Sequence, residues 1–548
     1  MPGVTYQKRI EFTAHGPVVI HLITAPKPGG VWGLHPVLSN GVIVGRERVT
    51  DMEKDLATTA TTVGVNGDLF NWNDAHPSGV LMQNGVLRAQ PTPSRSSIGI
   101  GADGKLDIRR VSFFGTWQGR GDQHPLSLLN RPPGPNGVSL FTPAWGPATP
   151  ATPGAVEAVF GAFPPAIPGR TLVGMITEFG HNGGTPIPAG GAVLMARGSM
   201  ATRLAAEASV LTSMAVRLNL TPSWDTMVDA LGGGPLIVRF GRPVFRAFED
   251  FTYSQTAPRD PRTAVGQRAD GTILLVAVDG RQPGYSAGMT NFELAQLLAR
   301  LGAVTASSLD TGGSTTMAFD GGLLNRPSDP GGERYVSEAL LVFYYGVYAP
   351  FPAVPVLSPN GDGIGESQYL SYKVVRPSTV TASIVGPDNV PRYSTTDQRA
   401  PGTYGVTWSG TTPDSQPLPE GRWRWVVKAV DDQSRTSSIE RGFWLNKTLA
   451  NLRVPAPFKA RRKGRATLAR FDLAHPARVS VTVETAKQVV IRRVVQNKSF
   501  GTGTRSVGWN GRLSGGHRIY PGRYVLRLTA SNAYGPVTMR RVITIRRG

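Results

Sequence analysis

The stretch that decides the fold of the first domain runs from residue 261 to residue 284 and reads PRTAVGQRADGTILLVAVDGRQPG. Its apolar run 273–278 is bounded by turn residues and is short, so it predicts a buried strand. The strand ends in Asp279-Gly280-Arg281, which places a carboxylate and a guanidinium directly after it. Strand ends are where rigid scaffolds present catalytic groups.

Two further predicted strands end in polar, Gly-containing turns. Residues 62–65 precede Asn66-Gly67-Asp68, and residues 304–309 precede the turn 310–316, which reads DTGGSTT. Three strands thus each deliver a carboxylate at one end. This pattern indicates a site that is assembled from distant parts of the chain.

Each of these two strands follows a predicted helix. Residues 290–293 form a capping box, in which Thr290 accepts from a first-turn amide and Glu293 reaches back. Leucines on one face then continue to Gly302, which ends the helix. Residues 50–53 begin a shorter helix in the same way.

The three carboxylates Asp68, Asp279 and Asp310 are the candidate acidic groups of the site. The turn after Asp310 offers backbone N–H groups and hydroxyls that suit phosphate oxygens. Arg262 and Arg281 supply the planar fork that matches phosphate geometry. Structural roles stay open, because Asp310 can cap its own turn, Asp279 can belong to a hairpin turn, and Arg262 can form a salt bridge.

The run from residue 261 to residue 317 resembles the phosphodiester glycosidase family. The motifs that carry the resemblance occur in the expected order between about residues 15 and 345; they are Val65–Phe70, Pro77–Gly79, Gly232–Leu236, Pro261–Gly266, Val278–Arg281, Ser286–Thr290 and Leu309–Met317. Two positions depart from the family pattern. Gly67-Asp68-Leu69-Phe70 stands where the family more often has Gly-Gly-Phe-Phe, and Thr311 replaces a usual glycine.

The resemblance implies hydrolysis of the bond between an anomeric carbon and a phosphodiester oxygen. The leaving group is a phosphomonoester, so holding its charge matters more than protonating it. We therefore expect Asp279, Asp310 and Arg262 to be catalytic, with Arg262 on the phosphate and the two carboxylates as acid, base or charge stabiliser. The residues expected to bind substrate are Asn66, Asp68, Arg281, Gly312, Gly313, Ser314, Thr315 and Thr316.

The C-terminal part of the chain contains an internal repeat. Residues 408–410 and 421–423 match residues 509–511 and 522–524 at an offset of 101. Period-2 apolar runs divided by Gly and Pro turns are typical of antiparallel β-sandwiches. The pair resembles immunoglobulin-like domains related to those of the flagellar hook-capping protein, which often begin with the Ser-Pro-Asn-Gly-Asp-Gly sequence found at 358–363.

These observations predict a multidomain protein with an α+β N-terminal catalytic domain and two antiparallel β-sandwich (immunoglobulin-like) domains. The predicted ranges are 1–348 for the catalytic domain with a loop-rich excursion at about 128–168, 349–356 for a Pro-rich linker, and 357–448 and 453–548 for the two sandwiches.

The net charge of +21 is concentrated at the C-terminal end of the chain. Residues 440–548 contain 23 Lys and Arg but only 3 Asp and Glu. Such a domain is expected to bind an anionic surface by long-range, salt-sensitive attraction. We favour an anionic cell-wall polymer over nucleic acid, and a general use of Arg for solubility is the alternative.

Composition excludes several other classes of site. The chain has no cysteine, so disulfides, thiolate metal sites and cysteine nucleophiles are absent. Its eight histidines show no metal-binding spacing, and no cofactor is expected. Asn360, Asp362 and Glu366 are a candidate calcium site, although their pattern falls short of an EF-hand loop.

We expect a secreted or cell-envelope hydrolase of glycosyl-1-phosphodiesters whose substrate is a phosphorylated glycan of a cell-envelope or extracellular polysaccharide. No membrane span is expected, because no run of 18 apolar residues occurs. No export signal is visible in this sequence. The alternatives are a non-catalytic carbohydrate-binding or exopolysaccharide assembly protein, and a hydrolase of unphosphorylated glycosides.

Overall fold

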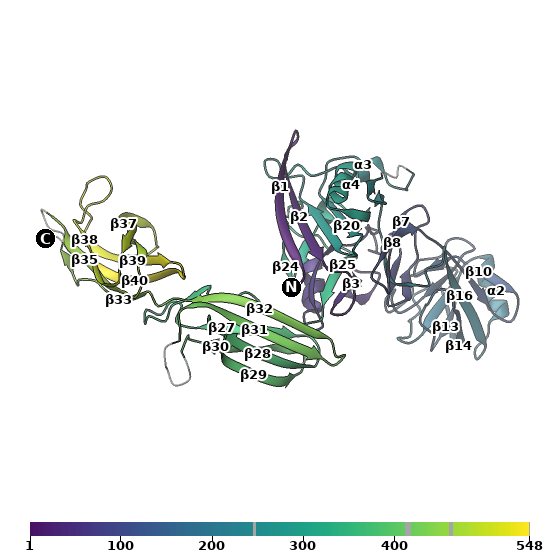
Figure 1. The fold of residues 1–548 in the computed structure, drawn as a ribbon. Helices are drawn as coiled ribbons and strands as arrows, with labels where there is room; N and C mark the ends of the chain where they lie inside the picture. The colour runs from purple at the N-terminus through teal and green to yellow at the C-terminus, as the bar shows by residue number, and fades with distance from the viewer. Residues whose placement is uncertain (245–247, 412–417, 460–463, 547–548) are drawn as a thin grey trace. The chain divides into compact units, whose positions relative to one another are not determined.

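The structure is a computed structural model that describes residues 1–244, 248–411, 418–459 and 464–546. The chain divides into two compact units, Met1–Tyr345 and Gly346–Gly548. It is mostly β, with 51% of residues in strands and 7% in helices (Figure 1). No helix in the described ranges is long and apolar enough to cross a membrane.

A seven-stranded sheet forms one layer of the first unit. Its strands in spatial order are β1 (Thr5–Thr13), β2 (Gly16–Ala25), β21 (Ile273–Val278), β20 (Arg262–Arg268), β22 (Ala303–Ser308), β18 (Leu236–Arg239) and β19 (Arg242–Pro243). Because β20 is antiparallel to both neighbours, its start meets the ends of β21 and β22, as Arg262 pairs with Val278 and Ala264 with Ser308. Asp279 and Asp310, which follow β21 and β22, therefore lie at the same end of the strands.

Helix α4 (Asn291–Arg300) covers one face of this sheet (Figure 1). Its capping box is present, since Thr290 accepts from the amide of Glu293 and the Glu293 side chain accepts from Thr290. Leu294, Leu297 and Leu298 are buried against the sheet. The sequence predicted this helix and both of its ends correctly.

A five-stranded sheet lies across a shared core from the first. Its order is β24 (Gly322–Leu323), β23 (Met317–Phe319), β4 (Thr61–Asn66), β25 (Glu338–Tyr344) and β3 (Trp32–Leu38). Val63, Leu340 and Leu275 belong to one buried cluster that joins the two sheets. Burial of this apolar surface stabilises the positions of the strand ends that form the site.

Helix α1 (Val49–Asp55) precedes β4, but it does not begin as the sequence suggested. Its N-cap is Arg48 without a side-chain cap. The hydroxyl of Thr50 donates to Glu333 instead, at 2.6 Å, and Glu53 is buried and accepts from the amide of Gly321. Tertiary partners have replaced the expected capping box here.

The remainder of the first unit consists of two more sheets, antiparallel except for the parallel pair β11–β12, and two α-helices. The smaller sheet has the order β6 (Val86–Ala89), β5 (Leu81–Gln83), β17 (Met227–Gly232), β7 (Ser96–Gly101) and β8 (Leu106–Arg110). The larger has the order β10 (Gln123–Leu126), β9 (Ser112–Gln118), β16 (Ser213–Thr221), β14 (Thr171–His181), β13 (Val156–Phe160), β15 (Ala192–Ala196), β12 (Val138–Phe141) and β11 (Leu128–Leu129). Helices α2 (Ser199–Glu207) and α3 (Tyr253–Thr256) are short. The segment 128–168 thus supplies β11, β12 and β13 between its loops.

The second unit contains two buried cores, each enclosed by two sheets. The first pair of sheets is β26 (Val356–Leu357), β32 (Thr436–Leu445), β31 (Gly421–Asp431), β28 (Ser378–Val385) and β29 (Pro391–Arg399), and β27 (Gln368–Val374) with β30 (Gly402–Trp408). The second pair is β33 (Leu449–Arg453), β35 (Ala466–Leu473) and β38 (Gly503–Trp509), and β34 (Phe458–Lys459), β40 (Gly535–Arg546), β39 (Gly522–Asn532), β36 (Ala477–Glu484) and β37 (Val490–Phe500). Both halves have the sandwich arrangement that the period-2 runs predicted.

The structure confirms part of the predicted fold class: the protein is multidomain and mostly β, with sandwich-like sheets in its C-terminal unit. The expectation of an α+β N-terminal domain needs correction, because that unit is largely β with four short α-helices in its described residues. The resemblance to hook-capping domains stays a prediction. The N-terminal unit is largely β because short apolar runs between turns, which form strands, outnumber segments with the 3.6-residue period of a helix.

Candidate functional site

The side chain of Asn66 joins the segments that form the site. Its Nδ2 donates to the carbonyl of Asp310 at 3.0 Å, and its Oδ1 accepts from the hydroxyl of Thr263 at 2.8 Å and from the amide of Thr316 at 3.1 Å. Asn66 is fully buried. With both ends of its amide occupied, it positions the Asp310 turn and has no free group for a sugar hydroxyl.

Asp68 lies in a buried acidic pocket beside the start of β25. Its backbone amide donates to Oε1 of Glu338 at 3.1 Å, and the side chain is 2% exposed. Burial, together with the nearby charge of Asp310, raises the pKa of Asp68 to about 6, although the amides of Leu69 and Gly79 and the charge of Arg95 lower it. Burial and the charge of Asp68 raise the pKa of Glu338 well above its usual range, so both favour the protonated form of Glu338.

Two glycines leave room for the carboxylate of Asp68. A Cβ added to Gly232, at the end of β17, would meet Oδ2 of Asp68, and one added to Gly79 would lie 2.7 Å from the same oxygen. Both glycines belong to short motifs, Pro77–Gly79 and Gly232–Leu236, to which the sequence analysis assigned no role. The structure explains why glycine stands at these positions: the charged side chain of Asp68 comes too close to leave room for a Cβ.

Asp310 is the second carboxylate of the site and is only partly buried. Its Oδ1 accepts from the amide of Thr311 at 2.8 Å. Burial raises the pKa of Asp310 to about 6, while the hydrogen bond from Ser314, the Thr311 amide and the charge of Arg334 lower it. Asp68 and Asp310 therefore interact electrostatically, and both titrate close to neutral pH.

A one-turn 3-10 helix, Gly312–Ser314, follows Asp310 and lies between two guanidinium groups. A Cβ on Gly312, whose φ is +67°, would lie 3.1 Å from Nη2 of Arg281, and one on Gly313 would meet Arg334. Arg281 is held by Asp260 at 2.7 and 3.0 Å. Two ion pairs, Arg281–Asp260 and Arg334–Asp329, thus flank the turn, and the carboxylate of Asp329 lies as close to Gly313 as Arg334 does.

Arg334 connects this turn with an open cavity. It is held by Asp329 at 2.8 and 3.0 Å, donates to the hydroxyl of Ser314 at 3.3 Å, and lies over the ring of Trp72 at 5.2 Å. The cavity has a volume of about 730 Å³ and is lined by Trp72, Arg334, Asp329 and Tyr335, among others. Trp72 is 61% exposed, so its ring is available to a sugar face.

Thr315 and Thr316 complete the turn, and both are buried. Their hydroxyl oxygens have no hydrogen-bond partner in the part of the chain that the structure describes. Buried hydroxyls of this kind retain the capacity to donate to an anion.

The structure places Arg262 away from this group of residues. The side chain is fully buried, and it donates to the carbonyls of Met289 at 2.8 Å, Gln255 at 2.6 Å, and Thr256 and Pro258 at 3.3 and 2.5 Å. Burial lowers the pKa of Arg262 to about 10. All three nitrogens are engaged, so Arg262 anchors a loop to β20 and we assign it no contact with substrate.

Asp279 is likewise committed to the protein interior. Its Oδ2 accepts from Nε2 of His21 and the hydroxyl of Tyr285, each at 3.0 Å. Its Oδ1 accepts from the side chain of Asn325 and the amide of Arg326, each at 3.1 Å. Four donors leave no free lone pair for proton transfer, so the geometry favours a structural role in place of the catalytic one.

One oxygen of each predicted calcium ligand accepts local hydrogen bonds, whereas Oδ2 of Asp362 has no partner among the described residues. Oε1 of Glu366 accepts from the amides of Asp362 and Gly363, and Asn360 and Asp362 accept from amides of the same loop. No group of three or more acidic or histidine side chains in the described ranges is placed to hold a metal ion. Calcium binding here stays a prediction.

Sequence reasoning missed three residues of the site, Glu338, Arg334 and Trp72. Glu338 could have been identified from the sequence, because it is a carboxylate at the start of the apolar run 338–344. Arg334 and Trp72 lie in loops without periodicity, and only the tertiary contact between them marks their position.

Comparison with known proteins shows which part of the first unit resembles a known family. Residues 173–343, which include Asp310, Arg334 and Glu338, match the family model described as phosphodiester glycosidase. The SPbeta prophage-derived uncharacterized protein YomE of Bacillus subtilis (strain 168) is 36% identical over 111 residues, 20% of this chain and 17% of YomE. The bovine (Bos taurus) N-acetylglucosamine-1-phosphodiester alpha-N-acetylglucosaminidase is 40% identical over 68 residues, 12% of each chain.

A solved structure supports the fold. A hypothetical protein from Synechocystis has 28% sequence identity and a TM-score of 0.53, with 62% of each chain covered. The chain covers less than a fifth of the length of the two curated relatives described above. The similarity to the phosphodiester glycosidase family therefore lies in residues 173–343 of the first unit.

Proposed function

We propose that the first unit hydrolyses a glycosyl-1-phosphodiester. The observation that carries this proposal is the pair of carboxylates, Asp68 and Asp310, each with a pKa of about 6, beside a turn flanked by two guanidinium groups. Carboxylates with raised pKa values are suited to proton transfer near neutral pH. Guanidinium groups are suited to phosphate.

The reaction consumes one water and breaks the bond between the anomeric carbon and the bridging phosphate oxygen. Ionised Asp310 accepts the proton of the attacking water, and the charge of Asp68 stabilises the positive anomeric carbon. The phosphodiester carries one negative charge, and the departing phosphomonoester carries two. Arg334 and the hydroxyls of residues 314–316 therefore bind the transition state more tightly than the substrate.

The test is the release of free sugar from a soluble glycosyl-1-phosphodiester and from the matching simple glycoside. We expect turnover of the phosphodiester and little of the glycoside, because the glycoside lacks the charge that Arg334 binds. Binding without release of sugar would indicate a carbohydrate-binding protein. Equal turnover of both compounds would show that phosphate is not recognised.

The two carboxylates also predict the pH dependence. Folding raises each pKa from 3.8 to about 6, so the native state binds more protons than the unfolded chain between these values. The free energy of unfolding should fall as pH rises from about 4 to about 6, by at most ~3 kcal/mol per carboxylate. Activity should run in the opposite direction: because both carboxylates must be ionised, kcat/KM should fall by about tenfold per unit just below pH ~6 and by up to about a hundredfold per unit at lower pH.

Urea unfolding between pH 4 and 7, together with a pH–rate profile, measures both effects. Asp68→Asn should remove the part of this pH dependence that Asp68 contributes between pH ~4 and ~6. A stability that does not change over this range, or a rate that is constant down to pH 4, would contradict the assignment.

We also propose that the second unit holds the enzyme on an anionic cell-wall polymer, in the cell envelope or outside the cell. Arg493, Arg527 and Arg540 occupy one cross-strand row, because Thr482 pairs with both Arg493 and Arg527, and Arg527 pairs with Arg540. Side chains opposite one another in neighbouring strands point to the same face. Among the described residues, Glu484 is the only one whose carboxylate lies within ion-pair distance of this row, with Oε1 3.9 Å from Nη1 of Arg527.

Removal of this surface should separate binding from catalysis. Deletion of 451–548, or Gln at all three arginines, should abolish salt-sensitive binding to isolated cell walls and leave turnover of a small soluble substrate unchanged. Co-sedimentation with walls at two salt concentrations measures the first, and sugar release the second. Wall binding that survives both changes would remove the proposed tether.

A further inference from the structure

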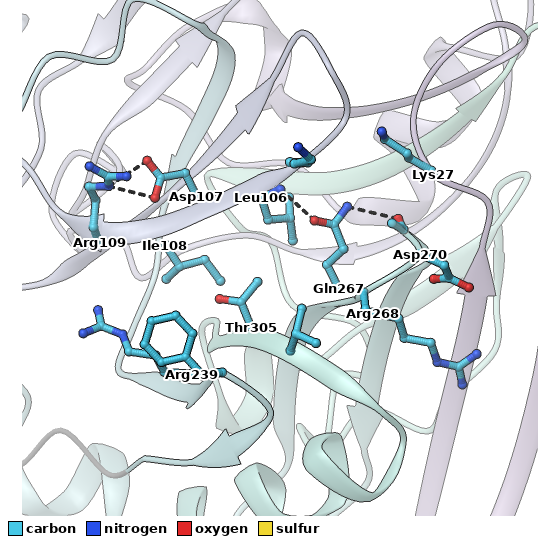
Figure 2. Close-up of a pocket in the computed structure, with 15 residues that line it drawn as sticks. Lys27, Leu106, Asp107, Ile108, Arg109, Arg239, Gln267, Arg268, Asp270 and Thr305 are labelled. Carbon is cyan, nitrogen blue, oxygen red and sulfur yellow. Dashed lines mark hydrogen bonds and ion pairs between the residues drawn. The ribbon is translucent and has the colours of Figure 1, made fainter.

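A second cleft lies at the opposite end of the strands that carry the site. It has a volume of about 650 Å³ and is bordered by β8 and by the ends of β18, β20 and β22 (Figure 2). Gln267 pairs with Ile273 and Thr305, at the far end of β20 from Arg262. At about 3.3 Å per residue, the cleft is roughly 20 Å from the Asp310 turn.

The cleft is positively charged. Five Lys and Arg line it against two carboxylates, Asp107 and Asp270. Asp107 is paired with Arg109 at 2.7 Å, and the Asp270 side chain accepts from the amide of Thr272 at 2.9 Å. Neither Lys27 nor Arg239 has a carboxylate within ion-pair distance among the residues that the structure describes. Arg239 also faces a like charge, Arg242, across the β18–β19 hairpin.

The two cations lie at different ends of the cleft. Figure 2 shows Arg239 on one side and Lys27 on the other, with Thr305 and Gln267 between them. Gln267 holds the floor in place, since it accepts from the amide of Leu106 at 2.9 Å and donates to the carbonyls of Gly104 and Gly271. The separated cations suit a ligand with more than one anionic group.

An unusual aromatic residue stands at the rim. Phe240 is 89% exposed and has a φ of +51°, followed by Gly241 at +73°. Positive φ at both turn positions defines a turn that favours Asn-Gly, and a bulky side chain there is strained. A strained backbone that displays an aromatic ring to water is a marker of function. Aromatic faces next to cations are a common way to bind sugar rings that carry anionic groups.

We propose that this cleft binds a segment of an anionic glycan, with Phe240 against a sugar ring and with Arg239 and Lys27 on its phosphate or carboxylate groups. The identity of the glycan as the polymeric substrate rests on the proposed function. The binding itself does not depend on hydrolysis. A site roughly 20 Å from the Asp310 turn would retain a polymer between successive cleavages.

The test uses the full chain carrying Asp310→Asn, which does not cleave the phosphodiester probe, and compares it by calorimetric titration with the same chain that also carries Arg239→Ala/Phe240→Ala. The probes are a tetrasaccharide linked through 1-phosphodiesters, a tetragalacturonide, neutral maltotetraose and inorganic tetrapolyphosphate. We expect the first two to bind at least tenfold more tightly than maltotetraose, and the variant to lose at least tenfold for them. Hydrogen exchange should show ligand protection in β8 and in the 268–272 turn.

The control is Arg300→Ala/Phe12→Ala in the same Asp310→Asn chain, which removes a similarly exposed pair elsewhere on the first unit and should leave binding unchanged. Basic residues of the second unit are identical in all three proteins, so their contribution cancels. Equal binding by the Arg239/Phe240 variant would overturn the proposal. Equal affinity for tetrapolyphosphate would reduce the cleft to a general anion site and would overturn its glycan specificity.

Hydrolysis is measured separately, so the two proposals can fail independently. The Arg239→Ala/Phe240→Ala variant should keep its kcat/KM on a small phosphodiester and lose several-fold on the polymer. Asp310→Asn should bind the tetrasaccharide in the cleft although it releases no sugar. If the double variant unfolds at a lower temperature, Arg239→Gln alone provides the same comparison with the turn intact.

Discussion

Asp310→Asn is expected to lower kcat for a soluble glycosyl-1-phosphodiester by about 10³-fold or more. The substitution preserves the shape of the side chain and its hydrogen bond from Thr311, but it removes the group that accepts the proton of water. General-base catalysis contributes about 10²–10⁴-fold, and the stabilising negative charge is lost as well. The KM should change little, because substrate binding depends on Arg334 and the turn.

Two carboxylates provide matched controls for this measurement. Asp225→Asn changes an exposed aspartate and should leave both kcat and stability unchanged. Asp279→Asn should act mainly on stability, since it disturbs a buried carboxylate with four donors; breaking such a network costs about 3 kcal/mol or more. If Asp279→Asn abolished turnover without lowering the unfolding temperature while Asp310→Asn did not, the two roles would have to be exchanged.

Arg334→Ala is expected to lower kcat by about 10²–10³-fold on the phosphodiester. The phosphate gains a negative charge as the bond breaks, so a guanidinium beside it stabilises the transition state more than the ground state; loss of one such donor typically costs this much. Its place beside Ser314 and Trp72, at the edge of the cavity, puts it where the phosphate is expected. The effect should be absent on the simple glycoside.

The matched comparison for Arg334 is Arg281, on the other side of the same turn. Arg281 is held by Asp260 and does not line the cavity in front of Trp72. We expect Arg281→Ala to have a smaller effect than Arg334→Ala, visible in KM more than in kcat. Arg334→Lys should retain more activity than Arg334→Ala, because lysine keeps the positive charge but lacks the planar pair of donors of the guanidinium. A larger loss in Arg281→Ala would place the phosphate on that side.

Local patterns in the sequence identified most of the elements that carry the site. The apolar run 273–278 and the capping box at Thr290 depend on neighbouring residues, so both could be predicted and both are found. The turn 310–316 was identified for the same reason. Helix α1 shows the limit of this reasoning, because the hydroxyl of Thr50 was expected to accept from an amide of its own helix but donates to Glu333, far away in sequence.

The roles of individual charged residues could not be derived from the sequence. Arg262 and Asp279 lie at the same end of the sheet's strands as Asp310, yet their buried side chains form hydrogen bonds with residues of other segments. Asp68 and Glu338 are 270 residues apart in sequence and share a hydrogen bond. A pKa depends on burial and on such neighbours, so a list of carboxylates does not reveal which one is catalytic.

The sequence by itself determined the strands, the turns and the uneven distribution of charge along this chain, since each depends on residues that are close in the sequence. Only the tertiary structure decided which of the carboxylates accept hydrogen bonds from buried partners. That choice depends on where each side chain finds its hydrogen-bond donors, and these donors come from segments that folding alone brings together.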